Sequence, residues 1–137
     1  MAITQYPANS WVAYAPAWTA TGGSPAIGTG SLVGRYLRSG NLCHVSVFLG
    51  MASSTTVAGT SWRFSLPVPA AGFAVLPVFA HDVGTAYYHG VANIAGPATT
   101  SVAISTSATA NIWGSSLPFS WTPASGDYLY FSGTYEC

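Results

Sequence analysis

Residues 32–50 read LVGRYLRSGNLCHVSVFLG and carry the strongest structural signal in the chain. In the second half of this stretch, alternate apolar side chains point to one face, because a β-strand has a side-chain period of two. Those side chains are Cys43, Val45, Val47 and Leu49. The first half, residues 32–38, has the composition of a partner strand, and Ser39-Gly40-Asn41 supplies the turn. The sequence therefore predicts a β-hairpin over this stretch.

The rest of the chain repeats the pattern at short intervals. Fifteen glycines, nine prolines and the absence of lysine disfavour helices. The predicted strands are residues 11–19, 32–38, 41–50, 61–66, 73–81, 86–94, 101–106 and 127–135. The first of these is expected near a sheet edge, because Pro16 has no N–H for a central ladder. Residues 73–81 are almost all apolar, which predicts a strand covered on both faces.

About eight antiparallel strands at this spacing predict an all-β fold, a single-domain β-sandwich or jelly roll. A chain of 137 residues is too short to divide into two hydrophobic cores. The first ten residues lack strand alternation. Residues 1–10 are therefore predicted to form a short extended N-terminal arm, and residues 11–137 to form the β-sandwich domain.

Charged residues are unusually scarce in this sequence. They make up 4% of the chain, against roughly 25% in an ordinary globular domain. They are Arg35, Arg38, Arg63, Asp82, Asp127 and Glu136, with a formal net charge of zero. Nucleic-acid binding and polybasic membrane binding are excluded, because both need clustered cations. So few charges give a free monomer little colloidal repulsion. We therefore expect a permanent assembly, packed against copies of itself or a large partner.

The sequence shows no targeting or membrane-spanning signal. No apolar run approaches the roughly 18 residues of a membrane helix, and the start lacks the basic and apolar regions of a signal peptide. We therefore expect synthesis in the cytoplasm. Two cysteines are too few for a disulfide framework. Cys43 is expected as a small buried hydrophobe and Cys137 as a loose thiol, and a bridge between them stays open.

Three polar residues invite a search for chemistry. His81, Asp82 and His89 could be imagined as metal ligands. Zinc sites use closely spaced Cys and His residues, and a catalytic one needs three protein ligands and an open position. Here two histidines lie on or near neighbouring predicted strands with a single carboxylate. The preferred interpretation is a turn aspartate with two half-exposed histidines. No GxSxG nucleophile motif is present, and the carboxylates available for glycoside hydrolysis are only Asp82, Asp127 and Glu136. We expect a non-enzymatic protein with no catalytic residue, metal or cofactor.

The aromatic residues offer a better lead. Their rings could stack on sugars, or they could form core and subunit contacts, since aromatic side chains dominate both. The residues concerned are Trp11, Tyr14, Trp18, Trp62, Tyr87, Tyr88, Trp113, Trp121, Tyr128 and Tyr130. The carbohydrate interpretation is the weaker one, because flanking acidic and amide groups are missing.

Two stretches resemble a known class of proteins. Residues 17–32 read AWTATGGSPAIGTGSL and continue into Gly34-Arg35-Tyr36, while residues 53–56 read SSTT and residues 62–71 read WRFSLPVPAA. This combination resembles small β-rich virion proteins of tailed bacteriophages, especially those of actinobacterial hosts. It is similar to the terminal domain of their minor tail or fibre proteins and to their head-decoration proteins.

The resemblance implies a non-enzymatic structural role, a β-sandwich fold and a homo-oligomer, expected to be a trimer, located in the virion. Fibre proteins carry a stalk, whereas this chain has only the short arm. A capsid decoration or cement protein bound to the major capsid protein is therefore the preferred interpretation. The alternative is a minor tail or tail-fibre tip domain, bound to other tail proteins and to a host receptor or glycan.

Five residues are candidate assembly contacts. An arm carrying Ile3, Tyr6 and Trp11 could lie across a neighbouring subunit. Arg35 and Arg63 either extend along a sheet edge with their charge in water, or pair between subunits with Asp127 or Glu136 at a trimer axis.

Overall fold

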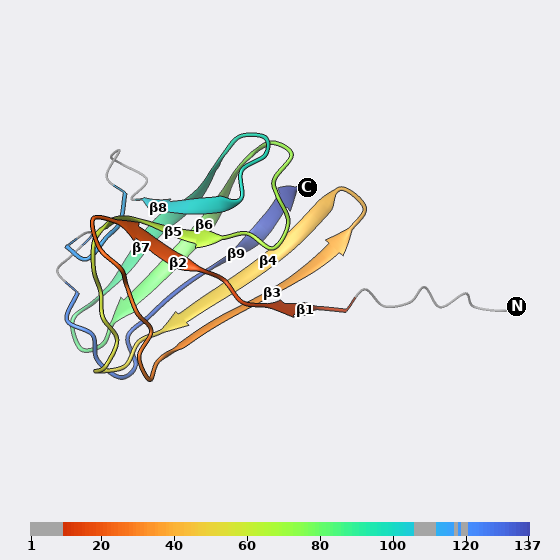
Figure 1. Cartoon of the computed structure of the whole chain (residues 1–137). Coiled ribbons are helices and arrows are strands. Elements are labelled where there is room, and N and C mark those ends of the chain that lie inside the picture. Colours follow the sequence, from red (N-terminus) through yellow and green to blue (C-terminus); the bar gives the residue numbers. More distant parts are fainter. Residues whose placement is uncertain (1–9, 106–111, 117, 119–120) are drawn as a thin grey trace, which may run out of the picture.

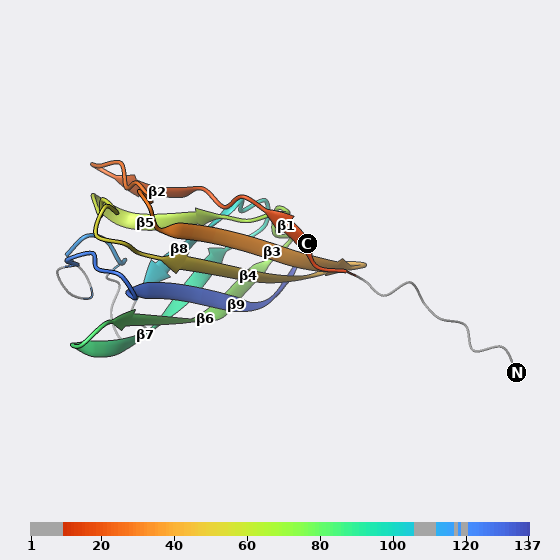
Figure 2. The same ribbon diagram turned by 90° about the horizontal axis from the view of Figure 1, so that it is seen from below.

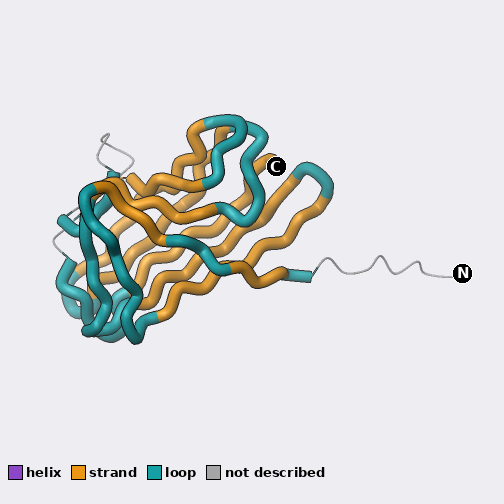
Figure 3. Tube along the Cα trace, in the orientation of Figure 1, coloured by secondary structure: helices purple, strands orange, loops and turns teal. Residues whose placement is uncertain are grey.

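The computed structural model describes residues 10–105, 112–116, 118 and 121–137 (Figure 1). It confirms the all-β fold: the described residues form strands and loops (Figure 3), and they include no helix able to cross a membrane. The strands are β1 (Val12–Tyr14), β2 (Trp18–Thr21), β3 (Ser31–Ser39), β4 (Leu42–Gly50), β5 (Thr60–Ser65), β6 (Phe73–Asp82), β7 (Ala86–Ala95), β8 (Ser101–Ser105) and β9 (Tyr128–Glu136). The predicted arm lies almost wholly outside the described residues.

All nine strands belong to one antiparallel sheet with the order β1-β3-β4-β9-β6-β7-β8-β5-β2. Strands β3, β4, β9 and β6 run side by side (Figure 2). The sheet curls so that the strands at the other end of this order fold back over β3, β4, β9 and β6. Phe64 of β5 therefore contacts Phe131 of β9, with ring centroids 5.7 Å apart. The result is a single sandwich-like domain with its core inside the curl.

The hairpin predicted from residues 32–50 is confirmed. Strands β3 and β4 pair in one register from Ser31 opposite Gly50 to Ser39 opposite Leu42. The alternate apolar side chains of β4 all face the core, and Cys43 is completely buried. Cys137 is also a free thiol but is partly buried against the core, and its backbone N–H donates to the Asn41 carbonyl at 2.8 Å. The C-terminal residue is thus held to the end of β4 and is less loose than expected.

Pro16 accounts for the ninth strand, because it divides the predicted strand 11–19 in two. The first piece, β1, pairs with β3, and the second, β2, pairs with β5 at the other end of the strand order. Both pieces are held at Ser65: the Tyr14 hydroxyl donates to the Ser65 carbonyl at 3.0 Å, and the Ala17 N–H donates to Oγ of Ser65 at 2.8 Å. The expected edge position is confirmed, and this segment links the two edges of the curled sheet.

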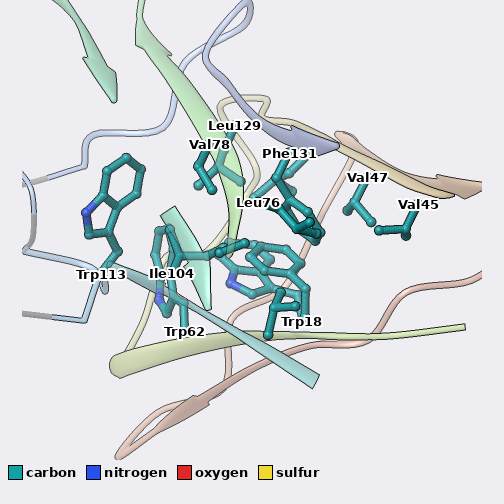
Figure 4. Close-up of a cluster of buried hydrophobic side chains, with 14 of the residues drawn as sticks. Trp18, Val45, Val47, Trp62, Leu76, Val78, Ile104, Trp113, Leu129 and Phe131 are labelled. Atoms are coloured by element: carbon teal, nitrogen blue, oxygen red, sulfur yellow. The ribbon is translucent and has the colours of Figure 1, made fainter. Parts of the chain in front are cut away.

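The core is built around large aromatic side chains from both sides of the curl (Figure 4). Trp18 packs edge to face on Trp62, with ring centroids 5.0 Å apart, and Trp62 and Phe64 are fully buried. The predicted amphipathic strand 61–66 is therefore confirmed. Gly90 on β7 makes room for the Trp113 indole, since a Cβ atom at Gly90 would lie 2.7 Å from Cζ2 of that ring.

The prediction that residues 73–81 are covered on both faces is wrong. Leu76, Val78 and Ala80 are buried, whereas Phe73 is 80% exposed and Val75 is 63% exposed. The described residues cover only one face of β6, although both faces are apolar. An apolar strand favours burial on both faces, but its sequence does not show whether residues of the same chain bury both of them.

Candidate functional site

The outer face of the sheet carries a continuous layer of rings across four neighbouring strands. We call this the outer aromatic layer. Its members are Phe48 of β4, Tyr128 and Tyr130 of β9, Phe79 and His81 of β6, and Tyr87 and His89 of β7. They occupy the outward positions that alternate with core residues such as Leu129 and Phe131, which are fully buried. The alternation of each strand therefore builds two chemically similar faces, one inside the core and one outside.

Strand register aligns these rings in two rows. The first row runs from β4 to β7 through Phe48, Tyr130, Phe79 and His89, each opposite the next. The second row, two residues further along the strands, runs through Tyr128, His81 and Tyr87. Side chains directly opposite or diagonal on one face of an antiparallel pair lie within contact distance. The layer is therefore fixed by backbone pairing.

Ring contacts join the two rows into one surface. Phe79 is the hub, with its ring centroid 5.3 Å from Tyr87, 5.1 Å from His89, 6.2 Å from Tyr128 and 5.7 Å from Tyr130. At one end of the second row, His81 stacks on Tyr87 at 4.4 Å. Phe48 and Tyr128 continue the layer onto β4, with ring centroids 5.8 Å apart. These spacings lie within the range in which aromatic pairs attract each other.

Four of the seven rings are exposed, the other three are partly buried, and the layer includes none of the charged residues. Tyr87 is 62% exposed, Tyr130 41% and Phe48 40%. Apolar side chains extend it along β6 at Phe73 and Val75. The six charged residues all lie in the described part of the chain, and none belongs to the layer. A neutral, ring-rich surface of this kind has the composition of a protein interface core, where aromatics are enriched and charges are depleted.

A shallow hollow opens beside the layer at the β6–β7 hairpin. Its volume is about 290 Å³, and it is lined by His81, Gly84, Thr85, Ala86 and Tyr87. The stacked histidine and tyrosine rings form an aromatic wall, and the threonine hydroxyl and the histidine ring supply polar groups.

Asp127 holds this hairpin in place from inside the subunit. The side chain is buried, and its two carboxylate oxygens accept hydrogen bonds from the Val83 N–H at 2.9 Å and the Ala124 N–H at 3.0 Å. The carboxylate therefore ties the turn after β6 to the loop before β9, directly beside Tyr128. Intersubunit pairing of Asp127, an alternative left open by the sequence, has no structural support, because backbone amides already occupy this carboxylate.

Of the candidate assembly contacts, the structure brings together Trp11 and Arg35. The guanidinium carbon of Arg35 lies 4.7 Å from the Trp11 ring centroid, a cation–π contact at the β1 edge of the sheet. Arg63 is exposed on β5, between Thr19 and Ala103 in register, and therefore lies apart from this pair. Ile3 and Tyr6 lie outside the described residues.

The ten tyrosine and tryptophan candidates do not share one environment. Tyr14 and Tyr88 are partly buried against the core, and Trp11 is exposed beside Arg35. Trp18, Trp62, Trp113 and Trp121 belong to the core, whereas Tyr87, Tyr128 and Tyr130 belong to the outer layer. The sequence interpretation missed Phe48 and Phe79. Strand alternation was the signal available for Phe48, which lies opposite in parity to the core residues of β4. Phe79 lies in residues 73–81, which the sequence predicted to be covered on both faces, so no outward aromatic position was expected there.

The polar residues considered for chemistry do not converge on a metal site. His81 and His89 face outward as members of the aromatic layer, where each contacts a neighbouring ring. Asp82 ends β6 opposite Ala86. Within residues 10–105, 112–116, 118 and 121–137, no three side chains of the His, Cys, Asp and Glu types gather in a metal-binding group.

Burial raises the pKa of two ionisable side chains, Cys43 near the start of β4 and Tyr135 near the end of β9. Desolvation raises the pKa of Tyr135 well above its usual range, with a further rise from its hydrogen bond to Cys43. The Tyr135 hydroxyl donates to the Val68 carbonyl at 2.7 Å, which ties the loop before β6 to β9. Burial also raises the pKa of the Cys43 thiol, so this sulfur stays protonated and unreactive near neutral pH.

Comparison with known proteins returns no match among protein-family models, curated proteins or solved structures. The resemblance to virion proteins of tailed bacteriophages therefore stays a prediction.

Proposed function

We propose that this chain is a non-enzymatic structural component of a tailed-bacteriophage particle, a decoration or cement protein of the capsid surface. It is made in the host cytoplasm and then built into the virion. The observation that carries this proposal is the neutral aromatic layer on the outer face of the sheet. Six charges in 137 residues give such a face little protection against association, so permanent incorporation into an assembly suits it better than free diffusion.

The proposed partners are copies of this chain, as a trimer, and the major capsid protein. Trp11 and Arg35 lie where the chain enters the domain, at the exposed β1 edge. A preceding arm bearing Ile3 and Tyr6 would reach a neighbouring subunit from this edge, while Arg63 would contact a partner on the opposite layer. These contacts would fix the protein on the particle, and the outer aromatic layer would remain available for packing.

Quantitative mass spectrometry of purified particles tests the proposal. A capsid decoration protein should be present at a copy number that matches the capsid lattice. Deleting residues 1–10 should abolish binding to particles while leaving the melting temperature nearly unchanged, since the first strand begins at Val12. Absence of the protein from particles, or undiminished binding of the truncated form, would reject the proposal.

The second candidate is a tail-tip domain that binds a host-surface glycan. The hollow beside His81 and Tyr87 favours it, because a ring face with adjacent hydroxyl and imidazole groups can hold a sugar. Glycan-array binding that is lost in Tyr87→Ala, together with only a few copies per particle, would favour this candidate over capsid decoration. Substitution of Trp18, Trp62 or Trp113 would not test sugar binding, since these are core residues.

A further inference from the structure

We infer that the outer aromatic layer is the surface through which copies of this chain pack against one another. This inference rests on the proposed structural role and names the partner at that surface. The occupant is a second copy of the same layer, brought face to face or around a symmetry axis. Three properties of the layer favour a copy of itself: its area, its polar groups and its lack of charge.

The exposed area matches one side of a stable protein interface. At roughly 200 Å² for each aromatic side chain, the seven rings leave on the order of 500 Å² accessible. Phe73 is 80% exposed, Val75 63% and Val33 56%, and they extend the surface along β6 and onto β3. With them the apolar surface reaches about 800 Å², the amount that each partner buries in a standard interface. Patches on monomers rarely exceed a few hundred Å².

The polar groups of the layer include both hydrogen-bond donors and acceptors, so the layer of one copy can bond to the same layer of another. They are the hydroxyls of Tyr87, Tyr128 and Tyr130 and the ring nitrogens of His81 and His89. A tyrosine hydroxyl both donates and accepts a hydrogen bond, and a neutral imidazole has one donor and one acceptor nitrogen. A contact between identical surfaces needs both roles on the same patch. This layer supplies them without requiring a partner of different chemistry.

Charge imposes no penalty on such a contact. Two identical surfaces carry the same charges, so any charged group in the layer would face like charge or lose its hydration in the interface. The layer itself holds no arginine, aspartate or glutamate, and Asp127 behind it is buried and bonded to backbone amides. Arg35, on the same face of β3 two residues beyond Val33, lies at the margin of the extended surface beside the Trp11 ring. The layers of two copies can therefore meet without placing like charges in their contact.

Analytical ultracentrifugation of the full chain tests the inference with three proteins. The wild type should sediment as a multiple of 14.1 kDa at micromolar concentration. Tyr130→Glu places a charge at the centre of the first row and should sediment at 14.1 kDa, with a dissociation constant raised about 30-fold or more, as for loss of a hot-spot residue. Ser24→Glu is the matched control. It adds the same charge to an exposed site in the loop between β2 and β3, and should keep the wild-type mass.

Tyr87→Lys gives a second measurement should Tyr130→Glu fail to fold, because Tyr87 is 62% exposed at the end of a hairpin. Reduced mass for this folded variant supports the inference. A wild type that stays monomeric, or unchanged mass for the folded layer variants, overturns it. The result stands apart from the proposed function: an assembled protein missing from particles would refute only the virion role. A monomer that binds particles, or whose layer binds a glycan, would refute only self-packing.

Discussion

Replacing Trp18 and Trp62 by phenylalanine, one at a time, tests how the hydrogen bonding of a buried indole N–H affects the stability of the core. The two indoles are 9% and 0% exposed, and their rings meet edge to face at 5.0 Å. They differ at one atom. The Trp62 Nε1–H donates to the Ala58 carbonyl at 3.0 Å, whereas Nε1 of Trp18 is buried and has no acceptor among the described residues.

The structure predicts unequal costs for the two substitutions. Each removes a similar part of a buried aromatic surface, so the packing losses are comparable. Trp62→Phe also loses a hydrogen bond worth about 1 kcal/mol, whereas Trp18→Phe removes a buried unpaired donor that costs about 1–3 kcal/mol. Trp62→Phe should therefore be less stable than Trp18→Phe by about 2–4 kcal/mol.

Urea unfolding followed by far-ultraviolet circular dichroism measures this difference, with both variants at the same protein concentration because association adds stability. At about 3 °C per kcal/mol, the melting temperatures should differ by roughly 6–12 °C. Equal losses for the two variants would refute the reasoning, as would a greater loss for Trp18→Phe. Either result would mean that the Trp18 N–H is satisfied in solution.

The remaining predictions concern the hairpin support, a close glycine contact and alkaline stability. Asp127→Ala removes the acceptor of two amide groups and should lower the free energy of unfolding by about 3 kcal/mol, and Asp127→Asn, which keeps one acceptor oxygen, should lower it less; thermal melting ranks the two. Gly90→Ala brings a Cβ within 2.7 Å of both the Trp113 ring and the Ser105 carbonyl oxygen and should cost about 3 kcal/mol. Gly40→Ala, in open space with a φ of 58°, should cost only about 1 kcal/mol, and equal costs would contradict the contact. Because burial raises the pKa of Tyr135, the unfolded chain loses this proton at lower pH than the folded chain, so stability should be complete below about pH 10 and fall above it. Stability unchanged between pH 8 and pH 12 would contradict the burial of this hydroxyl.

The strands were predictable from the sequence wherever polar and apolar residues alternate. In β4 the period of two correctly placed Cys43, Val45, Val47 and Leu49 on one face, which is the core face. Pro16 predicted an edge position because of its missing N–H, but local sequence could not show that the two halves of its segment pair with different strands. That division depends on the curl of the whole sheet, which brings Ser65 within reach of both halves.

The candidate site was only partly predictable. Tyr128 and Tyr130 were two of ten tyrosine and tryptophan candidates, for which sugar binding and core or subunit contacts both stayed open. The full layer was missed because β6 is apolar on both faces, and an outward Phe79 has the same local pattern as a buried one. Register, which aligns Phe79 with Tyr130 and His89, appears only when the strand order is known. The sequence therefore predicted that the protein assembles, but it did not show which face of the sheet would take part.

Hydroxyl-radical footprinting of the wild-type protein across a range of concentrations shows whether copies of the chain contact one another through the outer aromatic layer. Oxidation of Tyr87, Tyr130 and Phe48 should fall together as the protein concentration rises. This protection is expected because the proposed contact buries the outer aromatic layer against its own copy. Oxidation of the layer that is independent of concentration while the protein assembles would contradict it.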